Sequence, residues 1–175
     1  YIARGQMRTK YYDTTPGVLD FDYAYDAVGN MTEATNEVGT ITMEFFGPTH
    51  ANADQLKKIT YPAGQWLSYT YDHAGRRTSM LDQLGHRQDY HYDGAGHLQS
   101  INDETDGHIV QYAYDVAGRM QRKTLGNDVY ITFAYDPAGQ LLDLHNRKPD
   151  GTTLSRFQYT YDPRGLRTEM VTAYG

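Results

Sequence analysis

The chain of 175 residues contains no cysteine, so disulfide bonds and thiolate metal sites are excluded. It also has no apolar run of about 18 residues, the length that a membrane-spanning helix needs. Its 16 Lys and Arg residues are scattered and outnumbered by 22 Asp and Glu residues, which leaves a net charge of −6. Because nucleic acids and anionic membranes bind concentrated basic faces, we expect neither as a partner.

The chain is instead rich in tyrosine and glycine, with 17 residues of each. The pattern Tyr-Asp-x-x-Gly occurs six times, at a spacing of about 21–26 residues over most of the chain. The first gap is about twice as long and contains Phe46-Gly47, which we interpret as the anchor of a seventh, degenerate copy. The six regular copies begin at Tyr25, Tyr71, Tyr92, Tyr114, Tyr135 and Tyr161.

The residues before each Asp alternate in character. In Leu67-Ser68-Tyr69-Thr70-Tyr71, large apolar or aromatic side chains occupy every second position, which is typical of a half-buried strand. One face of the strand is therefore predicted to be aromatic, and its rings to pack against neighbouring repeats. The predicted aromatic ladder consists of Tyr23, Tyr25, Tyr69, Tyr71, Tyr90, Tyr92, Tyr112, Tyr114, Phe133, Tyr135, Tyr159 and Tyr161.

The Asp-x-x-Gly segment predicts a turn. Asp favours the first position of a type I turn because its carboxylate accepts nearby amides, and Gly supplies the positive φ of a bulge into the return strand. A second glycine, such as Gly64, Gly85, Gly126 or Gly151, is expected to reverse the chain again. The predicted turn residues are Asp26, Gly29, Asp72, Gly75, Asp93, Gly96, Asp115, Gly118, Asp136, Gly139, Asp162 and Gly165.

Each repeat is thus predicted to be a hairpin of two short strands, which is only marginally stable alone. Seven hairpins give about fourteen strands, and open twisted sheets rarely exceed about ten strands without curling. We therefore expect an all-β fold: residues 1–175 form one array of hairpins in a long, curled or spiralling antiparallel sheet. The region 45–65 is the degenerate repeat, and the array is expected to be a segment of a larger shell.

The octapeptides Tyr69–Arg76 and Tyr112–Arg119 read Tyr-x-Tyr-Asp-x-x-Gly-Arg and resemble the RHS/YD-repeat family. The resemblance implies a non-enzymatic segment of a shell wall, which encloses a C-terminal toxin and is secreted or lies at the cell surface. Its partners would be flanking repeats of the same polypeptide and the enclosed toxin domain. The family's Asp-Pro-rich self-cleaving segment is not carried over, because Asp136-Pro137 and Asp162-Pro163 lie inside ordinary repeat turns.

Chemical sites are the alternatives to this structural interpretation. Equivalent aspartates lie two strands apart, about 9–10 Å, which is too far for a shared Ca²⁺ ion. His86, His91 and His97 lack the spacing of a metal motif, and no cofactor is predicted. The acidic cluster Asp103-Glu104 and Asp106 lies in a turn-like loop and lacks a recognisable catalytic scaffold, so no catalytic residue is predicted.

A binding module of a cell-surface adhesion protein is the second hypothesis. Tyrosines stack on sugars, and Trp66, the only tryptophan, is the best single candidate for binding a surface glycan. Phe45–Gln65 departs most from the repeat pattern and is expected to protrude from the sheet edge as a long loop. That loop is either a plain insertion or a contact site for a protein partner.

Overall fold

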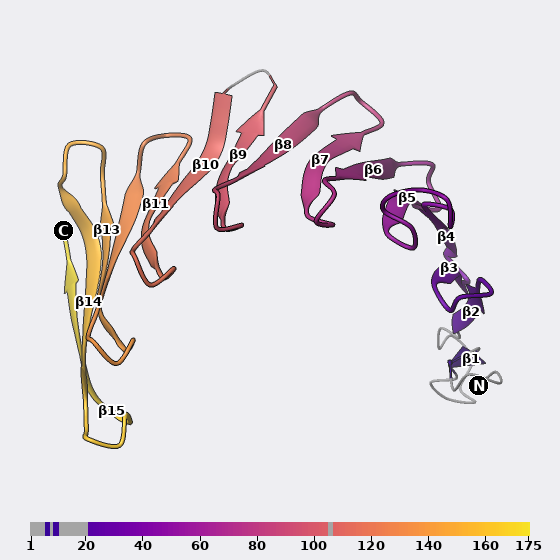
Figure 1. The fold of residues 1–175 in the computed structure, drawn as a ribbon. Coiled ribbons are helices and arrows are strands. Elements are labelled where there is room, and N and C mark those ends of the chain that lie inside the picture. The colour runs from indigo at the N-terminus through magenta and orange to yellow at the C-terminus, as the bar shows by residue number, and fades with distance from the viewer. Residues whose placement is uncertain (1–5, 8, 11–20, 105–106) are drawn as a thin grey trace. The chain divides into compact units, whose positions relative to one another are not determined.

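The computed structural model describes residues 6–7, 9–10, 21–104 and 107–175, and in these residues every regular element is a β-strand (Figure 1). No helix that could cross a membrane occurs among them. The chain divides into two compact units, Tyr1–Gln88 and Asp89–Gly175. Within each unit, successive strands pair in chain order and antiparallel. The predicted all-β fold of tandem hairpins is thus confirmed, whereas the curl of the array stays a prediction.

The described residues of the first unit form seven complete strands. They are β1 (Thr9–Lys10), β2 (Phe21–Tyr25), β3 (Met31–Asn36), β4 (Gly39–Phe45), β5 (Leu56–Thr60), β6 (Trp66–Tyr71) and β7 (Arg77–Asp82). The boundary between the units lies inside β8 (Arg87–Tyr92). The second unit continues with β9 (Leu98–Asp103), β10 (Gly107–Tyr114), β11 (Met120–Leu125), β12 (Tyr130–Tyr135), β13 (Leu141–Arg147), β14 (Thr153–Tyr161) and β15 (Arg167–Tyr174).

Each Tyr-Asp-x-x-Gly turn follows one geometry, which the turn from Asp115 to Arg119 illustrates. The Gly118 amide donates to the Asp115 carbonyl at 2.9 Å, and the Asp115 amide donates to the Arg119 carbonyl at 2.9 Å. Gly118 has a φ of 76°, which favours glycine. A bulge between Ala113 and Tyr114 shifts the register before the turn. The chain therefore reverses by a tight turn followed by a left-handed residue.

The hairpins use a similar turn at the opposite edge of the sheet, which the sequence interpretation only partly anticipated. Asp82 and Gly85 repeat the same two backbone hydrogen bonds and the positive φ. Gly151 also has the expected positive φ, of 87°. The chain also reverses at Gly126, in the turn closed by the Asp128 amide and the Leu125 carbonyl, but Asp128, with a φ of 61°, occupies the left-handed position there. Aspartate tolerates this conformation better than most residues, so the position did not require glycine.

The strands β4 and β5 form a hairpin in the region predicted to be a degenerate repeat, but the predicted anchor, Phe46, was wrong. Phe45 pairs with Leu56 after a bulge, as the second tyrosine does in other hairpins. Phe46 occupies the place of the turn aspartate, because its amide donates to the Gln55 carbonyl and its carbonyl accepts the Asp54 amide. Asp54, with a φ of 63°, replaces the turn glycine. Gly47 therefore does not hold the position of the turn glycine; its carbonyl accepts the His50 amide at 3.0 Å inside the insertion, which is confined to the stretch between Phe46 and Asp54.

The predicted loop over Phe45–Gln65 was therefore too long. Residues 56–60 form strand β5, in which Lys58, Ile59 and Thr60 pair with residues of β6. This strand was hidden from the pattern because Lys57-Lys58 interrupts its apolar alternation. The chain then reverses at Tyr61, whose carbonyl accepts the Gly64 amide at 2.9 Å.

Side-chain burial is moderate throughout the described residues. None of them has a side chain that is less than 2% exposed, and the most buried apolar residues are Val110 at 6% and Tyr69 at 9%. The intervening positions Thr70, Ala113 and Ala134 are exposed, in agreement with the period of two. The aromatic side chains are thus half-buried, and hydrogen bonds between neighbouring hairpins gain importance relative to a deep core.

The left-handed turn glycine gives a first testable prediction. Gly118→Ala should destabilise the chain by about 1–2 kcal/mol, because a left-handed φ is costly for a residue with a Cβ. That Cβ would also lie 3.0 Å from Nε2 of His97. The measurement is chemical denaturation followed by circular dichroism.

Gly94 provides the matched control. It lies inside another Tyr-Asp-x-x-Gly turn, and a Cβ placed there would meet nothing within 4 Å. Gly94→Ala should be neutral or stabilise by up to about 1 kcal/mol through the unfolded chain. Equal losses in the two variants would contradict the assigned turn geometry.

Candidate functional site

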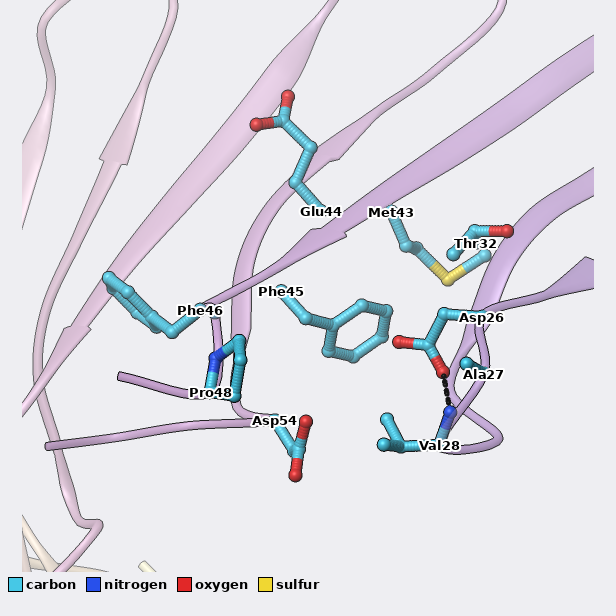
Figure 2. Close-up of a pocket in the computed structure, with 11 residues that line it drawn as sticks. Asp26, Ala27, Val28, Thr32, Met43, Glu44, Phe45, Phe46, Pro48 and Asp54 are labelled. Atoms are coloured by element: carbon cyan, nitrogen blue, oxygen red, sulfur yellow. Dashed lines mark hydrogen bonds between the residues drawn. The ribbon is translucent and has the colours of Figure 1, made fainter. Parts of the chain in front are cut away.

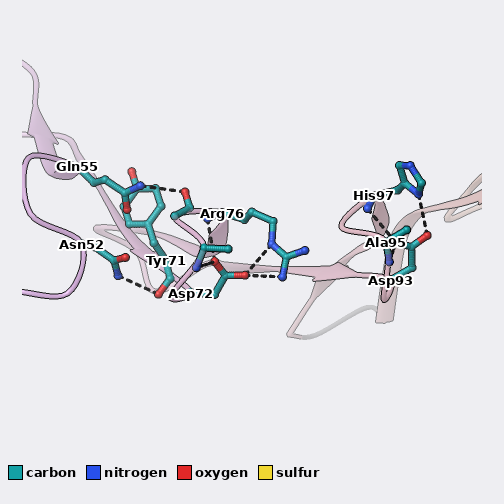
Figure 3. A network of polar contacts seen from close by, with 10 residues as sticks. Asn52, Gln55, Tyr71, Asp72, Arg76, Asp93, Ala95 and His97 are labelled. Atoms are coloured by element: carbon teal, nitrogen blue, oxygen red, sulfur yellow. Dashed lines mark hydrogen bonds and ion pairs between the residues drawn. The ribbon is translucent and has the colours of Figure 1, made fainter. Parts of the chain in front are cut away.

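The turn aspartates bind backbone amides of their own turns. Oδ1 of Asp72 accepts hydrogen bonds from the amides of Ala74 and Arg76, both at 2.9 Å (Figure 3). Oδ1 of Asp115 accepts the amides of Ala117 and Arg119 in the same way. A carboxylate so occupied fixes the turn and has little capacity left for a ligand.

The residue after the turn glycine usually binds the second carboxylate oxygen. Arg76 donates from Nε to Oδ2 of Asp72 at 2.8 Å, and Arg119 donates to Asp115 at the same distance. His97 contacts Oδ2 of Asp93 through Nδ1 at 3.0 Å. Figure 3 shows the Arg76 and His97 examples. Arg and His at this position are therefore alternative donors to one carboxylate oxygen.

These contacts change the acidity of the turn aspartates. The pKa of Asp72 is lowered, chiefly by the hydrogen bond from the Arg76 amide. The pKa of Asp115 is lowered, chiefly by the hydrogen bond from the Arg119 side chain. Desolvation acts in the opposite direction at both sites and is outweighed. Both carboxylates are therefore ionised at neutral pH and are poor candidates for a general acid.

The second tyrosine of the motif connects neighbouring hairpins through its hydroxyl. In the second unit, the Tyr135 hydroxyl donates to the Met120 carbonyl at 2.9 Å, across a sequence separation of 15 residues. We call this contact a tyrosine bridge. Where the preceding turn is described, its acceptor is the second residue after the left-handed turn position, as Met120 follows Gly118 and Leu56 follows Asp54. The tyrosine bridges join Tyr25 to Met7, Tyr71 to Leu56, Tyr114 to Leu98, Tyr135 to Met120, and Tyr161 to Leu141.

The bridges lie where the backbone ladder between hairpins ends. The strands β11 and β12 pair from Thr124↔Tyr130 to Arg122↔Thr132, and Met120 lies beyond the last pair. A backbone carbonyl left without a partner away from water costs free energy. The Tyr135 hydroxyl reaches this carbonyl from the next hairpin. Tyrosine, unlike phenylalanine, can therefore close the turn edge of the sheet.

The residue after the turn glycine also reaches the next hairpin. Arg119 donates from a terminal nitrogen to the Asp136 carbonyl at 3.0 Å, and its guanidinium lies 4.7 Å from the centre of the Tyr135 ring. His97 stacks on Tyr114 with ring centres 4.7 Å apart. We call a contact from the residue after the left-handed turn position to the next hairpin a forward contact. Side chains of Gln6 and Gln55 make it by donating to the carbonyls of Gly29 and Gly75.

Cations also cover the first tyrosine of several motifs. The Arg77 guanidinium lies 4.4 Å from the ring centre of Tyr69, and that of Arg167 lies 5.1 Å from Tyr159. Such cation–π contacts contribute about 0.5–1 kcal/mol at exposed sites. The aromatic ladder is thus held by its own return strands as well as by its neighbours.

Among the described residues, the chemical candidates of the sequence are not brought together. His86 and His97 bind the turn carboxylates Asp82 and Asp93, and His91 is exposed on β8. The described residues contain no group of three or more His, Asp or Glu side chains that could hold a metal ion. Asp103 ends strand β9 and Asp106 lies outside the described residues.

Trp66, the glycan candidate, begins strand β6 and is half-buried. The Lys58 ammonium lies 5.0 Å from the centre of its ring, so one face of the indole already contacts a cation. A sugar would stack on such a face. Glycan binding therefore stays a prediction without support from the contacts.

His145 is a buried group that sequence reasoning missed. Its side chain on β13 is 8% exposed and contacts the Thr153 hydroxyl through Nε2 and an Arg147 terminal nitrogen through Nδ1, both at 2.8 Å. Because arginine can only donate, Nδ1 must accept, and the proton resides on Nε2. Burial and the charges of Arg147 and Arg156 lower the His145 pKa, so the ring is neutral and structural.

The fold and the turn-edge contacts define a repeat domain built from tandem β-hairpins, in which each hairpin needs its neighbours. The chain matches the Teneurin YD-shell family over residues 23–169. It therefore belongs to that family, which confirms the resemblance stated above. The chain is a shell-type structural repeat domain.

Similar proteins include a bacterial toxin and a probable deoxyribonuclease. The chain is 32% identical over 136 residues to double-stranded DNA deaminase toxin A of Burkholderia cenocepacia (strain H111), covering 78% of the chain and 9% of that protein. It is 30% identical over 165 residues to the probable deoxyribonuclease RhsA of Dickeya dadantii (strain 3937), covering 89% and 11%. The chain thus spans about a tenth of the length of these relatives.

Solved structures share the fold. The crystal structure of TcdB2-TccC3-TEV superposes with a TM-score of 0.67 at 20% identity, covering 91% of the chain and 9% of that structure. The structure of TcdB2-TccC3 without its hypervariable C-terminal region gives a TM-score of 0.59 at 19% identity, covering 89% and 10%.

The tyrosine bridge predicts a specific loss of stability. Tyr135→Phe removes the hydroxyl and leaves the Met120 carbonyl without it, so the free energy of unfolding should fall by about 1–2 kcal/mol. Tyr112→Phe is the control, because the Tyr112 hydroxyl donates no hydrogen bond among the described contacts. It should change stability by less than about 0.5 kcal/mol. Similar losses for the two variants in urea titrations would refute the bridge.

The turn aspartates predict an acid dependence of stability. Their pKa values are lower in the folded chain than the ordinary 3.8, so the stability they provide is complete above that value. It is lost as the pH falls through the lower folded values. Thermal unfolding from about pH 5 down to pH 2 should show this loss.

Asp115→Asn should make that decline shallower, because the side chain no longer titrates. Asp128→Asn should change it much less, because the described contacts include no hydrogen bond to the Asp128 carboxylate and its ion partner, Nε2 of His108, lies 4.0 Å away. An unchanged decline in Asp115→Asn would contradict the role of this carboxylate.

Proposed function

We propose that this chain is a non-enzymatic part of the β-sheet wall of a shell, and that the shell encloses a C-terminal toxin domain for delivery to other cells. The observation that carries the proposal is the series of tyrosine bridges. They join hairpin to hairpin by contacts that repeat with the motif, as at Tyr114 and Tyr135. A wall needs lateral contacts of this kind, whereas an enzyme or a binding module needs one distinctive site.

The relatives support an enclosed toxin. The names of the two similar proteins describe a DNA deaminase toxin and a probable deoxyribonuclease. The matched region covers only 9% and 11% of those proteins, so nearly all of each lies outside the shared repeats. We propose that the longer polypeptide containing this chain is divided in the same way, with its toxic activity in a part outside residues 1–175.

The side chains support a structural role. The turn aspartates are the most numerous candidates for acid–base chemistry. Their carboxylates accept hydrogen bonds from amides of their own turns, as at Asp72 and Asp162. Their partners Arg76 and His97 serve the same turns. A catalytic pair needs an accessible carboxylate with a perturbed acidity suited to proton transfer.

The array is proposed to continue through both compact units and into flanking repeats of the same polypeptide. Strand β15 supports this, because it pairs with β14 from Arg167 to Tyr174 and its side chains are exposed. An exposed edge strand is a template for pairing with a further strand. A toxin shell of this kind would act outside the producing cell, so we propose an extracellular location.

The proposal can be tested in the full-length parent polypeptide. Replacing three bridging tyrosines of the second unit, Tyr114, Tyr135 and Tyr161, by phenylalanine should weaken the wall. Limited proteolysis should then cleave the C-terminal domain faster than in the wild-type protein, as followed by mass spectrometry.

Tyr112, Tyr130 and Tyr159 form a matched control set, because none of their hydroxyls donates a hydrogen bond among the described contacts. The triple phenylalanine variant at these positions should protect the C-terminal domain as the wild type does. A C-terminal domain that is digested at once in the wild-type protein would overturn the proposal of enclosure.

A further inference from the structure

One junction between hairpins in the first unit lacks the tyrosine bridge. Phe45 occupies the position of the bridging tyrosine at the end of β4 and has no hydroxyl. The equivalent carbonyl in the preceding hairpin belongs to Met31, which pairs with Tyr25 as Met120 pairs with Tyr114. The hairpins β2–β3 and β4–β5 are therefore not joined by the contact that joins Tyr71 to Leu56.

The forward contact takes a different form at the same junction. Asn30, which follows the turn glycine, donates its side-chain amide to Oδ2 of its own Asp26 at 3.0 Å. No forward hydrogen bond from Asn30 occurs in the described part of the chain, whereas the longer side chains of Gln55 and Arg119 make one. The turn of hairpin β2–β3 thus makes neither the tyrosine bridge nor the forward hydrogen bond to hairpin β4–β5.

A groove of about 560 Å³ lies at this junction (Figure 2). The Phe45 ring points between the turn at Asp26–Val28 and the inserted segment that begins at Phe46. Met43, Phe45, Val28 and Pro48 make its lining largely apolar. Val28 is 62% exposed, so this apolar surface is open to solvent.

The charged residues that line the groove are all acidic. They are Asp26, Glu44 and Asp54, and none of the lining residues that the structure describes is basic. Figure 2 shows Asp26 beside the Phe45 ring and Asp54 below it, with Glu44 directed away. Oδ1 of Asp26 is occupied by turn amides, as by Val28 at 3.0 Å. Within the described contacts, the exposed Asp54 carboxylate has no hydrogen bond or ion pair.

We propose that this groove binds an extended peptide segment that presents an arginine or lysine beside an apolar side chain. The apolar side chain would lie against Phe45, Met43 and Val28, and the cation would pair with Asp54. Glu44 already pairs with Lys57 at 3.9 Å, so the exposed Asp54 carboxylate and the apolar floor together favour this occupant over an acidic or wholly polar one. Peptide binding here goes beyond the proposed wall function and does not depend on it.

Each part of the occupant has a distinct physical role. The apolar side chain removes exposed surface of Phe45 and Val28 from water, which is the favourable term in most associations. The cation adds orientation and salt dependence more than affinity, because an exposed ion pair is largely screened. Binding is therefore expected to be weak and to require both groups.

The test uses the peptide acetyl-Leu-Arg-Phe-amide as a probe of the chain, with methyl and aromatic NMR spectra as the readout. Saturable shifts should appear at Met43, Phe45 and Val28, with a dissociation constant of about 1 mM or below. The same peptide with citrulline in place of arginine, which keeps the shape and removes the charge, should bind about threefold more weakly at low salt.

Asp54→Asn should reduce the affinity for the arginine peptide about threefold and leave the citrulline peptide unaffected. Asparagine tolerates the left-handed conformation of residue 54, so the turn is kept. The control is Asp128→Asn, which changes the other left-handed aspartate, in the second unit and outside the groove. It should bind the arginine peptide as the wild type does.

Phe45→Tyr offers a second variant, because it supplies the missing hydroxyl to the Met31 carbonyl and should narrow the groove. It should raise the unfolding temperature and weaken the binding of the arginine peptide about fivefold, because less apolar surface is left for the peptide to bury. Absence of saturable shifts, equal binding of the two peptides, or an unchanged affinity in Asp54→Asn would overturn the proposal. So would shifts at Phe45 that depend on protein concentration without peptide, which would assign the groove to a second copy.

Discussion

The hydrogen bond from a tyrosine hydroxyl to a carbonyl of the preceding hairpin is the constraint on which this structure depends. Strand pairing between hairpins ends before the turn edge, as it does between β11 and β12. The tyrosine ring spans the remaining gap, and its hydroxyl satisfies a carbonyl such as that of Met120. One side chain thus supplies apolar area and a directed polar contact, a combination that neither phenylalanine nor serine offers.

Other features follow from this contact. The acceptor carbonyl must stand at a fixed place after the turn, which a turn with a left-handed fourth residue ensures, as at Gly118. The repeat length can vary at the opposite edge: the bridge from Tyr161 spans 20 residues and that from Tyr135 spans 15. The longer strands β13 and β14 take up that difference. The sheet therefore keeps its lateral contacts with few deeply buried side chains.

Sequence patterns predicted the backbone better than the contacts. Alternation and Asp-x-x-Gly chemistry predicted the hairpins, because strand period and positive φ are local properties. The bridge from Tyr135 to Met120 was missed, since its partner lies in another repeat. The anchor at Phe46 was misplaced because Asp54 replaces glycine after an insertion, a substitution that leaves no motif. The groove beside Phe45 was equally hidden, as it results from a missing hydroxyl.

The central claim is that the tyrosine hydroxyl and the distant carbonyl stabilise the array together. The most direct test is a double-mutant cycle that combines Tyr135→Phe with replacement of the Met120–Gln121 peptide bond by an ester, which weakens the carbonyl as an acceptor. Unfolding free energies of the four proteins should give a coupling of about 1 kcal/mol. Additive losses, with no coupling between the two changes, would contradict the claim.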